Sequence, residues 1–104
     1  MERKHYKLRI LPLFEEDLNE VVDYISRRLR NPVAADELLD LVEESIHTRL
    51  SCPEAFEPYP STKERESIYY RIYVKNYIIF YVVVDDVMEI RRIRYNKRNM
   101  RNEL

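Results

Sequence analysis

The sequence contains no glycine, no tryptophan and a single cysteine, Cys52. Without glycine the chain cannot form a Walker loop, a dinucleotide-binding fingerprint or a nucleophile elbow, because each needs glycine at a tight turn or beside a phosphate. One cysteine cannot form an internal disulfide, which excludes the framework typical of small secreted proteins. The sequence also lacks an apolar run of about 18 residues and a signal-peptide core, which predicts a cytoplasmic protein with no membrane partner.

A length of 104 residues predicts one domain, 1–104, with a single hydrophobic core. The net charge of −1 conceals an uneven distribution: residues 12–67 carry fourteen acids and six bases, whereas residues 68–104 carry eight bases and four acids. Six of these bases lie between Arg91 and Arg101 with no acid among them. Such a cluster is typical of a surface that binds a polyanion, although an acidic partner protein or a solvated basic tail would also account for it.

The N-terminal half predicts a strand followed by a helical hairpin. Alternation over residues 6–11 predicts a strand with one buried face, which Pro12 ends. Apolar residues then recur at helical spacing over two stretches, 14–29 and 35–50. Between them Asn31 is a favourable N-cap and Pro32 suits the first helical position. The connection is so short that the two helices are expected to be antiparallel neighbours.

The C-terminal half predicts an antiparallel meander. Residues 51–66 are polar and rich in proline, which predicts a loop, and three β-rich runs follow it: 67–74, 77–85 and 87–95. Two-residue turns join the runs, with Asn76 expected to supply positive φ in the first and Asp85-Asp86 in the second. The order β-α-α-β-β-β therefore predicts an α+β fold, in which this antiparallel sheet packs on the N-terminal helical hairpin.

Alternation within the runs also predicts which side chains face the helices. Tyr70 and Ile72 are expected beneath the hairpin, whereas Arg71 lies on the opposite, open face together with Lys75. The middle run is apolar on both faces, which predicts a central strand covered on both sides. In the last run the parity of the apolar residues changes at 91–92, which predicts a β-bulge there.

This element order and several short motifs resemble the RelE/ParE toxins of bacterial type II toxin–antitoxin systems. The motifs are Asp17-Leu18, Asp23-Tyr24-Ile25 and Asn31-Pro32-Val33-Ala34-Ala35 in the hairpin, and Tyr70-Arg71-Ile72, Asn76-Tyr77, Phe80-Tyr81, Asp85-Asp86, Ile90 to Ile93 and Tyr95-Asn96-Lys97-Arg98-Asn99 after it. The resemblance implies a cognate antitoxin that wraps the toxin and masks it. It also implies one of two activities, because RelE-like members cleave mRNA in the ribosomal A site and ParE-like members inhibit DNA gyrase.

The resemblance further implies a set of site residues. The ribonucleases of the family spread basic and aromatic residues over the concave sheet face and the C-terminal end. By position, the matching catalytic residues are Arg71, Tyr95 and Arg98, and the matching RNA-binding residues are Lys75, Arg94, Lys97 and Arg101. No metal or other cofactor is expected, because the chain's few potential ligands (His5, His47 and Cys52) are too scattered to form a metal site.

RNA cleavage without a metal needs a base for the 2′-hydroxyl, a proton for the leaving oxygen and cations beside the phosphate. Arg71 and Arg98 are expected to stabilise the phosphate. Tyr95 either acts as the base, because surrounding cations favour a phenolate, or stacks on a splayed nucleobase. The structural alternatives are a Tyr95 that only closes the sheet edge and an Arg71 that pairs with Glu64 or Glu66.

Three features depart from the ribonuclease pattern. Ile78 stands where ribonuclease members usually place an arginine, Tyr95-Asn96 occupy a stretch where many place a histidine, and the long hairpin resembles ParE more than RelE. The first hypothesis is a ribosome-dependent mRNA endoribonuclease that arrests translation, with ribosome and mRNA as partners. The alternative is a ParE-like inhibitor that binds DNA gyrase without catalysis. A third is an inactive member that still binds its antitoxin.

Overall fold

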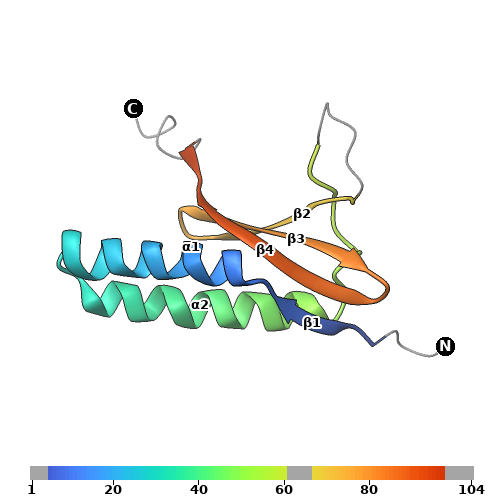
Figure 1. Ribbon diagram of the computed structural model, residues 1–104, viewed down its shortest axis with the longest axis horizontal. Helices are drawn as coiled ribbons and strands as arrows, with labels where there is room; N and C mark the ends of the chain where they lie inside the picture. Colours follow the sequence, from blue (N-terminus) through green and yellow to red (C-terminus); the bar gives the residue numbers. More distant parts are fainter. Residues whose placement is uncertain (1–4, 61–66, 98–104) are drawn as a thin grey trace.

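Two helices lie on one face of a four-stranded sheet (Figure 1). The computed structural model describes residues 5–60 and 67–97. The elements are β1 (Lys7–Ile10), α1 (Pro12–Asp23), the π-helical turn η1 (Tyr24–Arg28), α2 (Pro32–Leu50), β2 (Tyr70–Val74), β3 (Tyr77–Val84) and β4 (Val87–Tyr95). The predicted α+β class and element order are therefore confirmed. None of the helices in the described part of the chain combines the length and apolarity needed to cross a membrane.

The sheet is mixed, with the strand order β1-β4-β3-β2. The antiparallel pairs β2–β3 and β3–β4 confirm the predicted meander. The sequence did not indicate a partner for the first strand, which pairs in parallel with β4, from Lys7 opposite Val87 to Ile10 opposite Ile90. The first and last of the described strands thus lie side by side, and β4 is an internal strand.

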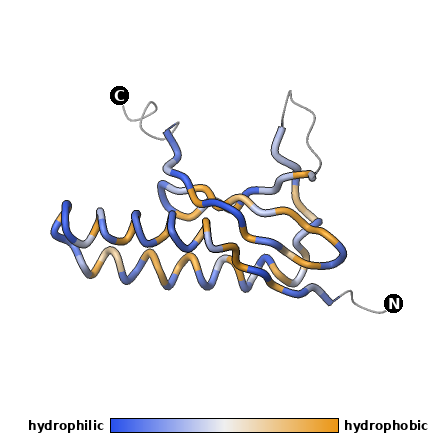
Figure 2. Tube along the Cα trace, viewed as in Figure 1, coloured by the Kyte–Doolittle hydropathy of each residue, from blue (hydrophilic) through white to orange (hydrophobic). Residues whose placement is uncertain are grey.

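The core lies between the helical hairpin and the sheet. Its buried members are Phe14, Leu38, Val42 and Ile46 from the helices, and Tyr70, Ile72, Val74, Ile79, Tyr81, Met88, Ile90 and Ile93 from the strands. In Figure 2 apolar and polar residues alternate along both helices, as expected of helices with one face on a core. The burial of Tyr70 and Ile72 confirms the predicted inner face of β2, although β2 begins at Tyr70 rather than at residue 67.

The tip of the hairpin combines a predicted cap with an unpredicted turn. The Asn31 side chain accepts a hydrogen bond from the Ala34 N–H at 3.1 Å, and Pro32 begins α2, as the sequence predicts. The backbone N–H of Leu29 donates to the carbonyl of Tyr24, five residues earlier, at 3.1 Å. This wider turn places Tyr24 and Leu29 on the same side of the helix. At its other end, α1 begins at Pro12, which starts the helix rather than only ending the strand.

Four of the described residues adopt positive φ: Arg30, Lys75, Asp85 and Asp86. The two aspartates confirm the second predicted turn. The prediction for the first turn is wrong, because Lys75, with φ of 51°, takes the left-handed conformation instead of Asn76. Asn76 is held by its carbonyl, which accepts a hydrogen bond from the Asn96 N–H at 2.7 Å. A left-handed L-residue costs about 1–2 kcal/mol, so this turn carries strain at Lys75.

The predicted bulge is present in β4. Ile90 pairs with Tyr81 and Arg92 with Phe80, which leaves Arg91 as the extra residue. The middle strand β3 is internal, but the prediction that both of its faces are covered holds only in part. Both helices lie on one face, and on the other face Val82 is buried whereas Val84 is exposed. That second face carries the candidate site.

Candidate functional site

The open face of the sheet is hollowed at the end where β2, β3 and β4 meet the loop before β2. The hollow has a volume of about 400 Å³ and is called the cationic pocket. Its lining residues are Tyr59, Pro60, Arg71, Tyr73, Ile78, Phe80, Arg94, Tyr95, Asn96 and Lys97. Three of them are cations and four carry aromatic rings, and among these described lining residues there is no carboxylate and no imidazole.

Strand register explains how these side chains meet. Tyr73 of β2 lies opposite Ile78 of β3, and Ile78 lies opposite Arg94 of β4. Because alternate residues of a strand point to the same face, Arg71 and Phe80 form the next row on the same side. Two neighbouring rows of the sheet thus supply the floor of the cationic pocket.

Arg71 lies between two tyrosine rings. Its guanidinium carbon is 5.1 Å from the ring centroid of Tyr59 and 5.6 Å from that of Tyr73. Both distances are in the range of cation–π attraction. No carboxylate of the described residues forms an ion pair with Arg71, and the alternative partners Glu64 and Glu66 lie outside the described part of the chain. Among the described residues, the Arg71 guanidinium is therefore oriented by aromatic rings and not by a carboxylate.

Two arginines of the predicted basic cluster form hydrogen bonds within the protein. Arg91 donates to Glu89 and to the Tyr69 hydroxyl, each at 2.9 Å. Burial lowers the pKa of Arg91, but these two hydrogen bonds more than offset it and the pKa is raised overall. Arg92 donates two hydrogen bonds to Asp17, at 2.7 and 2.9 Å. Both arginines thus serve the fold.

Asp17 links α1 to the part of β4 that extends beyond its pairing with β1. Besides binding Arg92, it accepts a hydrogen bond from the Ile93 N–H at 3.2 Å. Burial raises the pKa of Asp17, but the hydrogen bonds from Arg92 and Ile93 outweigh it and hold the pKa below its ordinary value. The carboxylate thus replaces a missing strand partner for the Ile93 N–H.

Arg94 and Lys97 are the other two described members of the basic cluster, and both line the cationic pocket. Both are exposed, and neither forms an ion pair with another described residue. The structure therefore brings Arg94 and Lys97 together with Arg71, as predicted. Arg98 and Arg101 lie outside the described residues.

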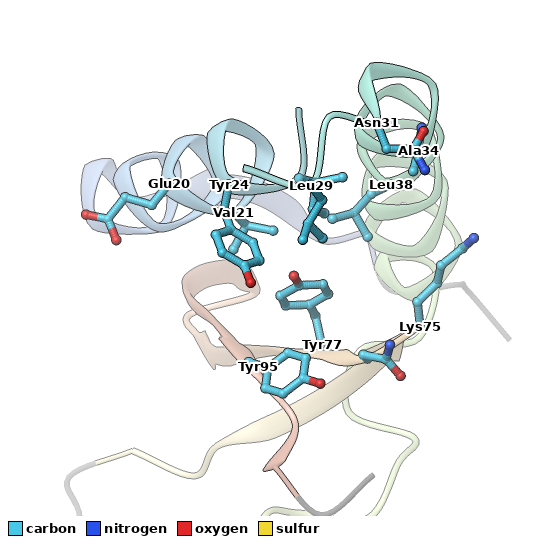
Figure 3. A pocket seen from close by; sticks show the side chains of 12 residues that line it. Glu20, Val21, Tyr24, Leu29, Asn31, Ala34, Leu38, Lys75, Tyr77 and Tyr95 are labelled. Carbon is cyan, nitrogen blue, oxygen red and sulfur yellow. The ribbon is translucent and has the colours of Figure 1, made fainter. Parts of the chain in front are cut away.

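A second hollow, the apolar cleft, opens between the hairpin tip and the same end of the sheet (Figure 3). Its volume is about 710 Å³, and its lining residues are Glu20, Val21, Tyr24, Ile25, Leu29, Asn31, Ala34, Leu38, Lys75, Asn76, Tyr77 and Tyr95. Figure 3 shows Tyr24, Tyr77 and Tyr95 turned toward one another, with Glu20 and Lys75 on opposite sides. Burial raises the pKa of Tyr77, so its phenol stays protonated.

Lys75 lines the apolar cleft rather than the cationic pocket. Alternation along the strand predicted that it shares a face with Arg71, and that placement is wrong. The physical reason is the turn: β2 ends at Val74, and the left-handed backbone at Lys75 breaks the alternation.

Tyr95 lines both hollows. Its ring meets that of Tyr77 edge-on, with the centroids 5.6 Å apart, and 42% of the residue is exposed. It pairs with Tyr77 across β3 and β4, so its ring follows the face of the sheet that the helices cover. The residue forms a wall between the cationic pocket and the apolar cleft.

A model of the family described as "ParE toxin of type II toxin-antitoxin system, parDE" matches residues 8–100. The chain belongs to this family. The protein is thus the toxin component of a type II toxin–antitoxin system, and its partner is a cognate antitoxin. No curated protein matches the toxin in sequence.

The solved structures that are similar to the toxin include the following three. The RelB-RelE antitoxin-toxin complex from Methanococcus jannaschii is 22% identical over 90% of this chain and 96% of that one, with a TM-score of 0.47. The archaeal RelE-RelB complex from Pyrococcus horikoshii OT3 is 21% identical over 91% and 99%, with a TM-score of 0.46. YafQ from E. coli strain BL21(DE3) is 16% identical over 91% and 98%, with a TM-score of 0.48.

Several pocket residues of the toxin were not singled out from the sequence. Tyr59 comes from the loop after α2, and its ring meets Phe80 edge-on at 5.3 Å. Phe80 could have been found from alternation, since it lies two residues from Ile78 on the open face. No sequence signal places Tyr59, because its position depends on how the loop folds back. Within residues 5–60 and 67–97, no group of three His, Cys, Asp or Glu side chains could hold a metal ion.

Proposed function

We propose that this ParE-family toxin is a metal-independent endoribonuclease that acts on mRNA at the ribosome and binds the RNA in the cationic pocket. The observation that carries the proposal is Arg71, held between the rings of Tyr59 and Tyr73. A guanidinium fixed in this way can donate two parallel hydrogen bonds to one phosphate. The surrounding rings offer stacking surfaces for unpaired bases, which is how proteins commonly bind single-stranded RNA.

The cleavage step proceeds by attack of a ribose 2′-oxygen on the adjacent phosphorus, with departure of the 5′-oxygen of the next nucleotide. A base takes the 2′-hydroxyl proton, an acid returns a proton to the leaving oxygen, and the products are a 2′,3′-cyclic phosphate and a 5′-hydroxyl. Negative charge accumulates on the phosphate in the transition state. Arg71, with Arg98 beyond the described residues, stabilises that charge in this proposal, and the Tyr95 phenol acts either as the base or as a stacking ring.

Arg94 can supply the cation that Ile78 does not. The ribonuclease members of the RelE/ParE toxins usually have an arginine at the position of Ile78. In this toxin Arg94 is the cross-strand partner of Ile78, and both line the cationic pocket. A guanidinium from β4 therefore reaches the same part of the pocket as one from β3 would.

The second candidate function is inhibition of DNA gyrase without catalysis. It is favoured by the match to the ParE family model and by the absence of a carboxylate or imidazole among the described lining residues of the cationic pocket. A binding surface for a protein or for DNA needs no acid or base. The same arginines would then contribute affinity rather than rate.

The antitoxin is expected to cover both hollows. An apolar cleft of about 710 Å³ with exposed Tyr24 and Leu29 at its edge suits an apolar segment that folds as it binds. Because Tyr95 borders both hollows, one continuous segment can cross from the cleft to the pocket. Co-expression with the antitoxin is expected to give a stable complex with a higher melting temperature than the free toxin.

The deciding experiment is induction of the toxin, followed by mapping of RNA 5′ ends on ribosomes and by a supercoiling assay with purified gyrase. Breaks within codons on ribosome-bound mRNA, with normal supercoiling, are the expected result. Blocked supercoiling with intact mRNA would replace the ribonuclease proposal with the second candidate. Tyr95→Phe then separates the two roles of the phenol: a large loss of cleavage indicates proton transfer, and near wild-type cleavage indicates stacking.

A further inference from the structure

Arg49, at the C-terminal end of α2, connects two parts of the cationic pocket without lining it. Its Nη1 donates to the backbone carbonyl of Arg71 at 2.9 Å and to the hydroxyl of Tyr81 at 2.9 Å. Its guanidinium carbon lies 3.5 Å from the ring centroid of Phe56, in the loop that follows the helix. One side chain thus contacts the strand that carries Arg71 and the loop that leads to Tyr59.

Tyr81 extends this link into the loop. It is a fully buried residue of β3, and its hydroxyl donates to the carbonyl of Pro53 at 2.7 Å. Burial raises the pKa of Tyr81, and the hydrogen bond from Arg49 only partly offsets the rise. The phenol therefore keeps its proton and remains a donor. The loop is thus held at Pro53 by Tyr81 and at Phe56 by the Arg49 guanidinium.

The loop delivers Tyr59 to the cationic pocket. The Tyr59 N–H donates to the carbonyl of Tyr69 at 2.6 Å, and its ring meets Phe80 edge-on. The same ring is one of the two beside Arg71. The distance between Tyr59 and Arg71 therefore depends on the position of the loop and on the position of β2. Arg49 contacts both.

We propose that Arg49 is a positioning residue of the cationic pocket, which acts by holding Tyr59 against Arg71 so that an unpaired base stacks on Tyr59 while its phosphate binds Arg71. The inference rests on the proposed RNA-binding function and adds to it a binding residue, Tyr59, and the residue that places it. Arg49 itself does not touch the RNA.

The chemistry of arginine fits this role in a way that lysine does not. A planar guanidinium can stack on the Phe56 ring and donate in its own plane to two acceptors. The ammonium of lysine carries the same charge but has no planar surface and a shorter reach. Arg49→Lys therefore keeps the positive charge but loses the planar stacking and the paired hydrogen bonds. The variant thus distinguishes positioning from a general electrostatic effect.

The test uses the full-length toxin, with ¹³C-labelled tyrosine rings, and a fluorescein-labelled single-stranded RNA oligonucleotide. In Arg49→Lys and in the charge-neutral Tyr81→Phe, the Tyr59 ring signals are expected to move toward unfolded values, while those of Tyr77, whose ring packs against Tyr95 in the apolar cleft, stay in place. Tyr59→Ala is expected to weaken RNA binding about tenfold or more, through loss of one stacking surface. Arg27→Lys, the same substitution at an exposed site outside both hollows, should change neither readout.

A double-mutant cycle decides whether Arg49 acts through Tyr59. We expect Arg49→Lys to weaken RNA binding by itself and to add nothing in the Tyr59→Ala background. Unchanged Tyr59 signals in both Arg49→Lys and Tyr81→Phe, or losses of affinity that add in full, would overturn the proposal. If the wild-type toxin fails to bind the oligonucleotide while the Tyr59 signals move in both variants, the RNA function fails and the structural role of Arg49 stands.

Discussion

The cationic pocket and the apolar cleft occupy the same end of the sheet and both include residues of the meander, yet their chemistry is opposite. The pocket presents Arg71, Arg94 and Lys97 among aromatic rings, whereas the cleft is lined mainly by apolar and tyrosine side chains. Alternate side chains of a strand point to opposite faces, and the cleft lies on the face covered by the hairpin, which supplies most of its apolar side chains. One short meander can therefore serve two ligands of different chemistry, with Tyr95 between them.

The largest effect is expected from a change that removes the support of both hollows. Ile72 is 5% exposed in the core beneath β2, so Ile72→Ala should lower the free energy of unfolding by about 2–5 kcal/mol through lost burial and a cavity. Urea denaturation measures the loss. Ile68→Ala, the same change at a residue that is 62% exposed, should stay within about 0.5 kcal/mol of wild type. If Ile72→Ala lowered the free energy of unfolding only slightly, the stability of β2 would not depend on its packing against the hairpin.

The next effect separates the two hollows directly. Arg71→Ala should slow mRNA cleavage by about 10²–10³, the typical cost of removing one donor to a transition state. Its stability should stay within about 0.5 kcal/mol of wild type. Lys75→Ala removes the same charge at the rim of the cleft and should leave cleavage nearly unchanged. Equal losses in the two variants would show that cleavage depends on net charge and not on the pocket.

A change in the cleft should have the converse effect. Leu29 is 56% exposed at the hairpin tip, and Leu29→Asp should weaken antitoxin binding by about 10–100-fold, since burying a leucine stabilises by about 1.5–3 kcal/mol. Cleavage by the free toxin should be unaffected. Val33→Asp, at a residue that is 66% exposed and outside the cleft, is the matched control for calorimetric titration. Full antitoxin affinity in Leu29→Asp would place the antitoxin elsewhere.

A smaller, pH-dependent effect is expected where α1 joins β4. Because the pKa of Asp17 is depressed in the folded state, its pairing with Arg92 stabilises fully above the unfolded pKa, near pH 4, and is lost as the pH falls below it. Asp17→Asn removes the charge and replaces one of the two accepting carboxylate oxygens with an NH2 group. The difference in free energy of unfolding between wild type and Asp17→Asn should therefore shrink as the pH is lowered from about 7 to about 3.

The control for this pH series is Asp23→Asn. Asp23 pairs with Arg27 on the exposed surface of the hairpin, where ion pairs contribute little. It should show almost no difference from wild type at any pH. A pH-independent difference for Asp17→Asn would mean that the carboxylate acts only as a hydrogen-bond acceptor for Ile93.

The smallest effect concerns the strained turn at the rim of the cleft. Lys75→Gly should raise the free energy of unfolding by about 0.5–1 kcal/mol, because relief of the left-handed backbone outweighs the added entropy of the unfolded chain. Thermal unfolding is the measurement. Asn76→Gly, where φ is not positive, should instead destabilise the toxin. If both changes have the same sign, strain at Lys75 is not the cause.

Most of the fold could be predicted because its determinants are local. The Asn31 cap, the aspartate turn and the bulge at Arg91 each follow from a few neighbouring residues. The parallel pairing of β1 with β4 could not be predicted, since it joins residues 80 positions apart. The residue pattern of a strand does not indicate which other strand it pairs with. The conformation of Lys75 could not be predicted either, since its turn is joined by a backbone hydrogen bond to Asn96, which is distant in the sequence.

The site divides in the same way. Alternation alone put Arg71 on the open face, and the basic cluster supplied Arg94 and Lys97. The sequence could not reveal that Arg92 belongs to the fold, because its partner Asp17 is 75 residues away. Nor could it place Tyr59, whose position depends on contacts among a helix end, a loop and a buried strand.

The position of β4 in the sheet has a consequence for biosynthesis. Among the described strands it is the last along the chain, yet it lies between β1 and β3 and provides Arg94 and Tyr95. A nascent chain that ends before Val87 has the residues for the hairpin and the β2–β3 pair but lacks a wall of each hollow. Pairing between strands that are far apart in the sequence is slow, because the entropic cost of closing the loop is incurred before the stabilising contacts form. Neither hollow is therefore complete until β4 has been synthesised.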